Sequence, residues 1–241
     1  MSERYIGLMS GTSLDGVDGV VADFADGTLR VLAHASRPFA AGFRAELLAL
    51  NRSGPDELHR AALAANTLVQ AYAATVADLL AATSLKPADI RAIGAHGQTV
   101  RHRPQEFSGT GYTCQLNNPA LLAELCAIDV VADLRSRDVA AGGQGAPLAP
   151  FFHQFLFART HATVGVLNLG GIANLTVLSP GGRIAGFDCG PANALMDSWC
   201  EQHLGRAFDD GGAWAATGAV HAPLLATWLA HPYFAQQPPK S

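Results

Sequence analysis

The apolar residues at the start of the chain form short runs and then change to helical spacing. Runs at residues 5–9, 17–24 and 29–35 are separated by a Ser-Gly-Thr-Ser loop and by an Asp-Gly turn, which predicts a three-stranded meander. Residues 43–50 and 57–82 carry apolar positions three and four residues apart. This spacing predicts two helices that cover the strands.

The middle of the chain predicts shorter elements with polar residues between them. These elements are a strand at residues 90–95, a helix at 119–126, a buried strand at 129–132, a glycine-rich loop at 139–147 and a helix at 148–157. The first of these strands is expected to stop at His96, so that Gln98 and Thr99 follow its end. Polar groups just past a strand end favour a binding site.

The last part of the chain repeats the opening pattern. Strands are expected at residues 163–169, 172–178 and 183–187, and helices at 194–204 and 222–229. The duplication predicts an α/β fold with two similar lobes, at residues 1–130 and 131–241. Because the second lobe has few strands, we expect its core to be incomplete.

Composition narrows the classes of protein. The 241 residues are 49% hydrophobic and 15% charged, which is typical of a globular protein. A net charge of -4 argues against nucleic acid as a partner. We expect no membrane span, because charged residues or glycine interrupt every apolar run, and no secretory signal, because the N-terminus has no extended apolar region followed by a small-residue cleavage site. Four scattered cysteines without a C-x-x-C pair argue against a disulfide framework and favour the cytoplasm.

The loop at residues 10–16 combines backbone amides, hydroxyls and the carboxylate of Asp15. Such a loop could cradle phosphate oxygens and hold a cation. It lacks the lysine of a Walker A loop, and a plain hairpin turn is equally consistent with its spacing.

Three further groups of polar residues have two interpretations each. Asp188 follows a predicted strand and precedes a helix, so it could be a general base or a helix cap. Arg135 and Arg137 could clamp a substrate carboxylate, or they could pair with Asp133 and Asp138 on a surface. The histidines, at residues 96, 102 and 153 among others, do not have zinc-site spacing, and such histidines are usually structural.

Five segments occur together and in one order along the chain. They are GLMSGTSLDGVD at residues 7–18, AHGQTV at 95–100, DLRSRDVAAGGQGAPL at 133–148, NLGGIANL at 168–175 and FDCGPAN at 187–193. Together they resemble the anhydro-N-acetylmuramic acid kinases, relatives of actin, sugar kinases and heat-shock-70 ATPases. The resemblance implies two ribonuclease-H-like lobes, the second incomplete in this chain.

The resemblance also implies a reaction. A kinase of this family uses ATP, Mg²⁺ and water to convert 1,6-anhydro-N-acetylmuramic acid to N-acetylmuramic acid 6-phosphate during peptidoglycan recycling in the cytoplasm. The family suggests a homodimer. Two other classes stay open, which are a non-catalytic sugar-binding module and a glycoside hydrolase acting through Asp188 and Asp133. The hydrolase needs its two carboxylates about 5–10 Å apart.

The same resemblance assigns residues to roles. Asp188 would be the catalytic base, and Thr99, Arg135 and Gln144 would contact the sugar. Asp15 would hold magnesium through water. The residues expected to bind the phosphates of ATP are Gly11, Thr12, Ser13, Leu14, Asp15, Gly16, Val17, Asp18, Gly170, Gly171 and Asn174.

Three residues depart from the family pattern. Cys189 replaces a threonine, and Ala192 and Asn117 replace glycines. Asn117 would be tolerated if its φ were positive. Family members continue beyond Ser241 with a glycine-rich adenosine-binding segment, so we expect this chain alone to bind ATP weakly.

Overall fold

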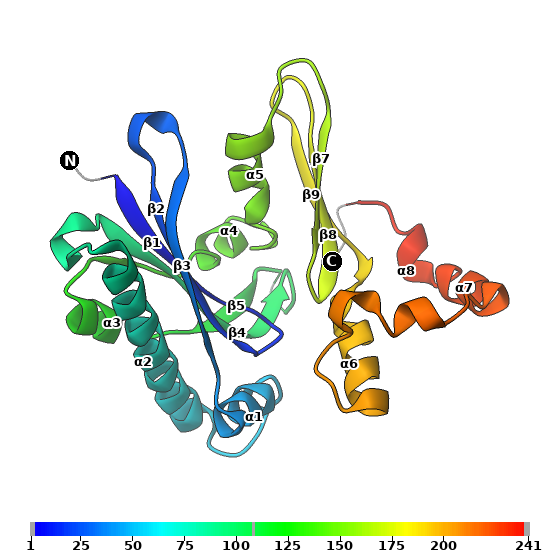
Figure 1. Ribbon diagram of the computed structural model, residues 1–241, viewed down its shortest axis with the longest axis horizontal. Coiled ribbons are helices and arrows are strands. Elements are labelled where there is room, and N and C mark those ends of the chain that lie inside the picture. Colours follow the sequence, from blue (N-terminus) through cyan, green and yellow to red (C-terminus); the bar gives the residue numbers. More distant parts are fainter. Residues whose placement is uncertain (1–2, 108, 239–241) are drawn as a thin grey trace. The chain divides into compact units, whose positions relative to one another are not determined.

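The computed structural model describes residues 3–107 and 109–238 (Figure 1). They divide into two compact units, of which the first ends at Ala146 and the second begins at Pro147. The predicted boundary between residues 130 and 131 falls inside a short strand of the first unit. No helix in the described part of the chain has the length and apolar character that a membrane span requires.

The first unit is built on a mixed sheet. Its strands are β1 (Arg4–Ser10), β2 (Gly16–Asp23), β3 (Arg30–Pro38), β4 (Ala92–Pro104), β5 (Gly111–Leu116) and β6 (Val130–Val131). Their order is β3-β2-β1-β4-β5, and β6 also pairs with β4. Strands β1 to β3 are antiparallel, as the meander prediction requires, whereas β4 is parallel to β1 and β6 is parallel to β4. This is the topology of a ribonuclease-H-like lobe, and the predicted α/β class is confirmed.

Helices cover this sheet and close its core. They are α1 (Ala41–Leu50), α2 (Glu57–Thr83), α3 (Pro119–Cys126) and α4 (Ser136–Ala140). Helix α2 packs against β2 and β3, and α3 packs against α2 (Figure 1). The buried face of α2 includes Leu68, Tyr72 and Val76, which pack with Ile6 of β1 and Ile93 of β4. Burial of such side chains is the main source of stability in a domain of this kind.

The second unit repeats the meander, as predicted. Its elements are α5 (Ala149–Phe157), β7 (Val164–Leu169), β8 (Ile172–Leu178), β9 (Ile184–Pro191), α6 (Asn193–Leu204), α7 (Ala222–Leu229) and α8 (Pro232–Ala235). The three strands are antiparallel in the order β7-β8-β9, and α5 packs against β8 and β9. Large apolar side chains remain in solvent, including Phe151 at 72% exposure and Trp199 at 58%. The expectation of an incomplete core agrees with this exposure.

The prediction that a strand ends at His96 is wrong. Strand β4 continues to Pro104 and pairs with β5, which the sequence did not predict. The polar residues after His96 give this stretch the character of a loop, yet Gln98 is completely buried and hydrogen-bonded inside the sheet. A buried polar side chain is compatible with a strand when its hydrogen bonds are made.

Three smaller differences concern short elements. The strand predicted at residues 129–132 has two residues, and Val131 is exposed rather than buried. The segment predicted as a loop from residue 139 begins inside α4. Helix α8 was not predicted, because four residues are too few to produce a periodic pattern.

Candidate functional site

The loop after β1 connects two strands that separate from each other. Strands β1 and β2 pair as far as Met9 and Asp18, after which β1 follows β4 and β2 follows β3. The amide of Leu14 donates to the carbonyl of Gly11 at 3.2 Å, which closes a turn. The connection is therefore a hairpin loop between two diverging strands. This form is compatible with a plain turn and with a phosphate-binding loop.

Two buried side chains anchor this loop. Gln98 of β4 accepts a hydrogen bond from the hydroxyl of Ser10 and donates to the carbonyl of Gly11 at 3.2 Å. Leu14 is 5% exposed and packs with apolar residues of α1 and α2, although its backbone has a φ of 57°. Thr12 and Ser13 between them are exposed, and among the described residues their amides have no hydrogen-bond acceptor. An anchored turn with outward amides can bind anionic oxygens.

The remaining residues assigned to this loop have different surroundings. Val17 is buried in the core, so its side chain cannot reach a ligand. Asp18 lies on β2, where it accepts a hydrogen bond from Ser36 of β3. A Cβ at Gly16 would overlap the carbonyl of Arg37, so the close approach of β3 requires glycine there.

Asp15 is the exposed carboxylate of the loop. Its Oδ1 accepts a hydrogen bond from the Ser13 hydroxyl at 2.8 Å, and its backbone carbonyl accepts from the amide of Phe39. Carboxylate oxygens are ligands that Mg²⁺ accepts, often through water. No group of three or more His, Cys, Asp or Glu side chains within residues 3–107 and 109–238 could hold a metal alone.

Arg135 lies beside β4 and is held at two points. Its Nε donates to Nε2 of His96 at 2.8 Å, and its Nη1 donates to the carbonyl of Gly145 at 2.5 Å. The side chain is half-buried, and burial lowers the pKa of the guanidinium. In the described part of the chain Arg135 has no carboxylate partner, so the interpretation as a surface ion pair with Asp133 or Asp138 is wrong.

Asp138 instead fixes the glycine-rich loop that follows. Its Oδ2 accepts a hydrogen bond from the amide of Gly145 at 2.7 Å, and its carbonyl accepts from the amide of Gly143 at 2.8 Å. A Cβ at Gly143 would overlap the Asp138 carboxylate. These contacts hold the carbonyl of Gly145 where Arg135 donates to it.

Of the two other predicted sugar contacts, Gln144 is adjacent to Gly145, the residue that binds Arg135, and Thr99 lies on β4. Thr99 of β4 accepts a hydrogen bond from Gln115 of β5 at 3.1 Å. Burial and then the Arg135 charge lower the pKa of His102, while a hydrogen bond with the backbone of Gln144 opposes the shift. His102 thus has both Arg135 and the exposed Gln144 as neighbours. Arg135 and Gln144 are therefore neighbours of β4, the strand that also carries Thr99.

Asn117 does not have the positive φ that the family's glycine would suggest. Its Nδ2 donates to the carbonyl of Ala95 at 3.2 Å, while its Oδ1 is buried without a partner among the described residues. Left-handed backbone occurs instead at Gly97 of the neighbouring strand β4. Gly97 has a φ of 79°, and a Cβ there would lie 2.5 Å from the carbonyl oxygen of Leu116.

In the second unit Asp188 lies within β9 rather than after it. It is paired with Asn174 of β8, so the predicted base and one predicted phosphate contact are cross-strand neighbours. The helix-cap interpretation is wrong, because the N-cap of α6 is Ala192 and Asp188 lies four residues earlier. Tyr233 of α8 donates its hydroxyl to the carbonyl of Asp188 at 2.9 Å.

The second glycine pair closes the turn between β7 and β8. The carbonyl of Gly170 accepts from the amide of Asn193 at 2.9 Å, and that of Gly171 accepts from the amides of Ala192 and Ala194. The loop carbonyls therefore satisfy the first amides of α6, which would otherwise lack acceptors. This arrangement orients the loop at the start of the helix.

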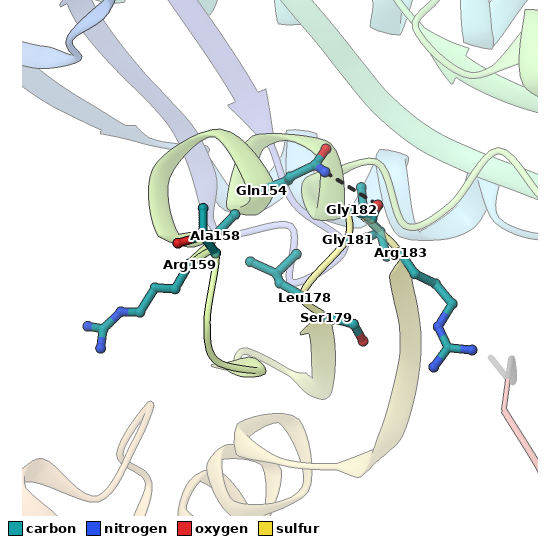
Figure 2. Close-up of a pocket in the computed structure, with 10 residues that line it drawn as sticks. Gln154, Ala158, Arg159, Leu178, Ser179, Gly181, Gly182 and Arg183 are labelled. Carbon is teal, nitrogen blue, oxygen red and sulfur yellow. Dashed lines mark hydrogen bonds between the residues drawn. The ribbon is translucent and has the colours of Figure 1, made fainter.

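A cavity of about 160 Å³ lies at the other end of the β8–β9 hairpin (Figure 2). Figure 2 shows Gln154 directed toward Gly182, whereas Arg159 and Arg183 extend away from the cavity. Leu178 and Ile184 pair there, four residues along each strand from Asn174 and Asp188. At about 3.3 Å per residue this is about 13 Å away, so the cavity is separate from the predicted residues.

Three residues that support the predicted site were given no specific role from the sequence. Gln98 anchors the first loop, His96 contacts Arg135, and Tyr233 contacts the backbone of Asp188. For Gln98 a signal existed, since it occupies an inward position in a strand whose other inward residues are apolar. The contacts of His96 and Tyr233 join segments far apart in sequence and leave no local pattern.

The segments that build these surroundings match one family along almost the whole chain. The family model described as anhydro-N-acetylmuramic acid kinase matches residues 3–241. The chain belongs to this family. It is 61% identical over 261 residues to an anhydro-N-acetylmuramic acid kinase of Albidiferax ferrireducens, covering 100% of this chain and 67% of the relative. It is 62% identical over 244 residues to the one of Variovorax paradoxus, covering 99% of this chain and 65% of the relative.

The chain spans about two thirds of the length of these anhydro-N-acetylmuramic acid kinases. Among solved structures, component A of the (R)-2-hydroxyglutaryl-CoA dehydratase of Acidaminococcus fermentans is similar with a TM-score of 0.46 and 11% identity. That similarity covers 91% of this chain and 61% of the other.

Proposed function

We propose that this chain supplies the sugar-binding and phosphate-binding residues of an ATP-dependent anhydro-N-acetylmuramic acid kinase. The reaction converts 1,6-anhydro-N-acetylmuramic acid, ATP and water to N-acetylmuramic acid 6-phosphate and ADP in peptidoglycan recycling. Family membership and the activity of relatives at 61% and 62% identity, which are named anhydro-N-acetylmuramic acid kinases, support this activity. The geometry supports the parts assigned to individual residues.

The observation that carries the proposal is the unpaired charge of Arg135. A half-buried guanidinium without a carboxylate partner among the described residues is costly unless an anion joins it. N-acetylmuramic acid differs from N-acetylglucosamine by a lactyl group that carries a carboxylate. Arginine binds carboxylates through two parallel hydrogen bonds. With Gln144 adjacent to the Gly145 that binds Arg135, this region beside β4 suits an acidic sugar.

Asp188 acts as the general base in this proposal. Its carboxylate accepts a proton from water as the water oxygen bonds to C1 of the sugar. The C1–O6 bond breaks, its electron pair stays on O6, and O6 then bonds to the γ-phosphorus of ATP as the bond to ADP breaks. Within hydrogen-bond reach, such a base contributes about 10²–10⁴ in rate.

The amides of Thr12 and Ser13 are the groups proposed to bind phosphate oxygens in the first unit. In the second unit, the residues proposed to bind phosphate oxygens are Gly170, Gly171 and Asn174. Mg²⁺ bound to ATP would neutralise phosphate charge, and the exposed carboxylate of Asp15 is the group proposed to bind its hydration shell. Use of ATP and four free cysteines favour the cytoplasm. A homodimer stays a prediction from the family.

Turnover in ¹⁸O-labelled water tests the reaction. The chain is incubated with the anhydrosugar, with and without Mg-ATP, and the products are analysed by mass spectrometry. The proposed reaction places the label on the anomeric hydroxyl of the 6-phosphate and none in its phosphate. Label in free phosphate would indicate uncoupled ATP hydrolysis and would contradict the mechanism.

The same experiment separates the two other classes. Conversion of the anhydrosugar without ATP indicates a glycoside hydrolase, whose two carboxylates, Asp133 and Asp188, belong to different units. Sugar binding by calorimetry without any conversion, at concentrations of Mg-ATP that saturate the chain, indicates a binding module. Either result replaces the kinase proposal for this chain.

A further inference from the structure

His96 is the side chain that touches the predicted sugar contact Arg135. The imidazole Nε2 lies 2.8 Å from Nε of the arginine, and the two residues are 39 positions apart in the sequence. Arg135 comes just before α4, whereas His96 belongs to β4. The contact therefore fixes the arginine to the sheet.

The hydrogen bonds of Arg135 determine which of its edges remains available. A guanidinium has five N–H donors in a rigid planar fork. The Nε–H and one Nη1–H are used by His96 and by the carbonyl of Gly145. Among residues 3–107 and 109–238, Nη2 has no hydrogen-bond partner. The edge formed by Nη1 and Nη2 can thus still make two parallel hydrogen bonds to a carboxylate.

His96 is itself held in one orientation and one tautomer. Its Nδ1 lies 2.7 Å from the carbonyl of Gly97, to which only a protonated nitrogen can donate. Nε2 is therefore the unprotonated nitrogen and accepts from Arg135. The amide of Gly97 donates to the buried hydroxyl of Tyr72 at 3.1 Å, so α2 supports this turn of the strand.

We propose that His96 is a positioning residue that aims Arg135 at the carboxylate of an acidic sugar. The inference rests on the proposed function, in which Arg135 binds the sugar. His96 makes no contact with the substrate in this proposal. It acts by restricting the arginine, which otherwise loses rotamer freedom when the ligand binds.

A neutral acceptor suits this task better than a carboxylate would. An aspartate at this place would also hold the guanidinium, but it would neutralise the charge that attracts the ligand. Burial lowers the pKa of His96, the hydrogen bond with Gly97 partly opposes this shift, and the Arg135 charge adds to it, so the neutral imidazole is favoured. His96 therefore orients Arg135 without neutralising the positive charge that binds the carboxylate of the sugar.

Calorimetry with two sugars tests the proposal. The 241-residue chain and its variants are titrated with 1,6-anhydro-N-acetylmuramic acid and with 1,6-anhydro-N-acetylglucosamine, which lacks the lactyl carboxylate. For His96→Leu we expect affinity for the acid to fall by about tenfold or more. Without its contact to His96, Arg135 is less well oriented, and its hydrogen bonds to the carboxylate of the sugar are weakened. Affinity for the neutral sugar should change by less than about twofold. His96→Gln, which keeps an acceptor near Nε2, should restore most of the loss.

The controls separate this inference from the proposed function. Arg135→Ala should remove the preference for the acid, and His59→Leu, at an exposed position of α2, should change neither affinity. If Arg135→Ala keeps the preference, the proposed role of Arg135 fails. If Arg135→Ala loses it but His96→Leu does not, or if His96→Leu weakens both sugars equally, the positioning role is overturned.

Nuclear magnetic resonance provides a measurement that needs no ligand. The Nε–H signal of Arg135 in the ¹⁵N-labelled chain should exchange slowly with water in the wild type and in His96→Gln. It should exchange rapidly in His96→Leu. If this signal already exchanges rapidly in the wild type, or if His96 carries its proton on Nε2, the proposal is wrong whether or not the chain binds a sugar.

Discussion

The two units share a three-stranded antiparallel meander but differ in what covers it. In the first unit the 27-residue helix α2 lies on β2 and β3, and Leu68, Val69 and Tyr72 are completely buried. In the second unit α5 and α6 are short, and their large apolar residues remain exposed. A strand meander alone does not make a core, because a sheet needs an apolar layer against each face that it buries.

The difference extends to the glycine-rich loops. The first loop is anchored by the buried Gln98 and by Leu14, so its position depends on the core. The second loop is fixed through the carbonyls of Gly170 and Gly171, which bind the start of α6. Similar strand patterns thus position two loops by different means, one through side chains and one through the backbone.

The largest expected effect tests whether the second unit supplies the chemistry. Asp188→Asn should lower turnover by about 10²–10⁴, because the amide cannot accept the proton of water. Sugar affinity should change by no more than a few fold. The measurement is the steady-state rate with saturating sugar and Mg-ATP, and Asp210→Asn is the control in the same unit. Turnover close to wild type would remove Asp188 from the reaction.

Core substitutions test the difference in packing directly. Leu68→Ala, at 0% exposure, should lower the free energy of unfolding by about 2–5 kcal/mol. Leu169→Ala, at 61% exposure in β7, should change it by about 0.5 kcal/mol or less. Urea unfolding followed by circular dichroism and hydrogen exchange measures the first unit. Tryptophan fluorescence measures the second, where Trp199, Trp214 and Trp228 all lie. Equal costs would contradict the comparison.

Glycine substitutions compare the two loops. Gly16→Ala should destabilise the protein by about 1–3 kcal/mol, because the added Cβ overlaps the carbonyl of Arg37 and β3 must move. Gly171→Ala should cost much less, since its Cβ would lie 3.4 Å from that of Ala194, an ordinary contact. Thermal unfolding of both variants checks this order. A larger loss in Gly171→Ala would indicate that the second loop is the more constrained one.

The smallest expected effect is a pH dependence of the first unit. Burial, and then Arg135, lower the pKa of His96 in the folded protein, so as pH falls the unfolded chain binds the proton first. The free energy of unfolding should therefore decrease as pH drops below about 6.5 and level off below the folded pKa. His102, whose pKa burial also lowers, contributes with the same sign. Urea titrations between neutral and mildly acidic pH measure the slope.

His96→Gln should reduce this slope without removing it, because His102 remains. A slope that is unchanged in His96→Gln would show that His96 is not responsible.

The sequence predicts both meanders because their runs are apolar, short and separated by glycine turns. It predicts α2 for a similar reason, since a 27-residue helix repeats its apolar face many times. It fails for β4, whose inward Gln98 is satisfied by Ser10 and Gly11, residues that are distant in sequence. Local polarity cannot reveal a hydrogen bond formed only when two strands meet.

The candidate site shows the same limit. Motif resemblance assigned Arg135, Thr99 and Gln144 to one sugar site, and this assignment stays a prediction. Spacing could not show that Arg135 pairs with His96 rather than with Asp133 or Asp138, because the choice depends on where α4 lies. It could not show that Leu14 and Val17 face the core.

Leu14 gives the first loop a stiffness that its exposed residues do not suggest. A leucine in left-handed backbone costs about 1–2 kcal/mol, whereas burial of its side chain contributes about 1.5–3 kcal/mol. The turn therefore opens only when Leu14 leaves its apolar cluster, so opening is a rare, cooperative event rather than continuous fraying. If the loop binds phosphate as proposed, the hydroxyls and amides of Thr12 and Ser13 are already ordered before the ligand arrives, so binding costs little conformational entropy.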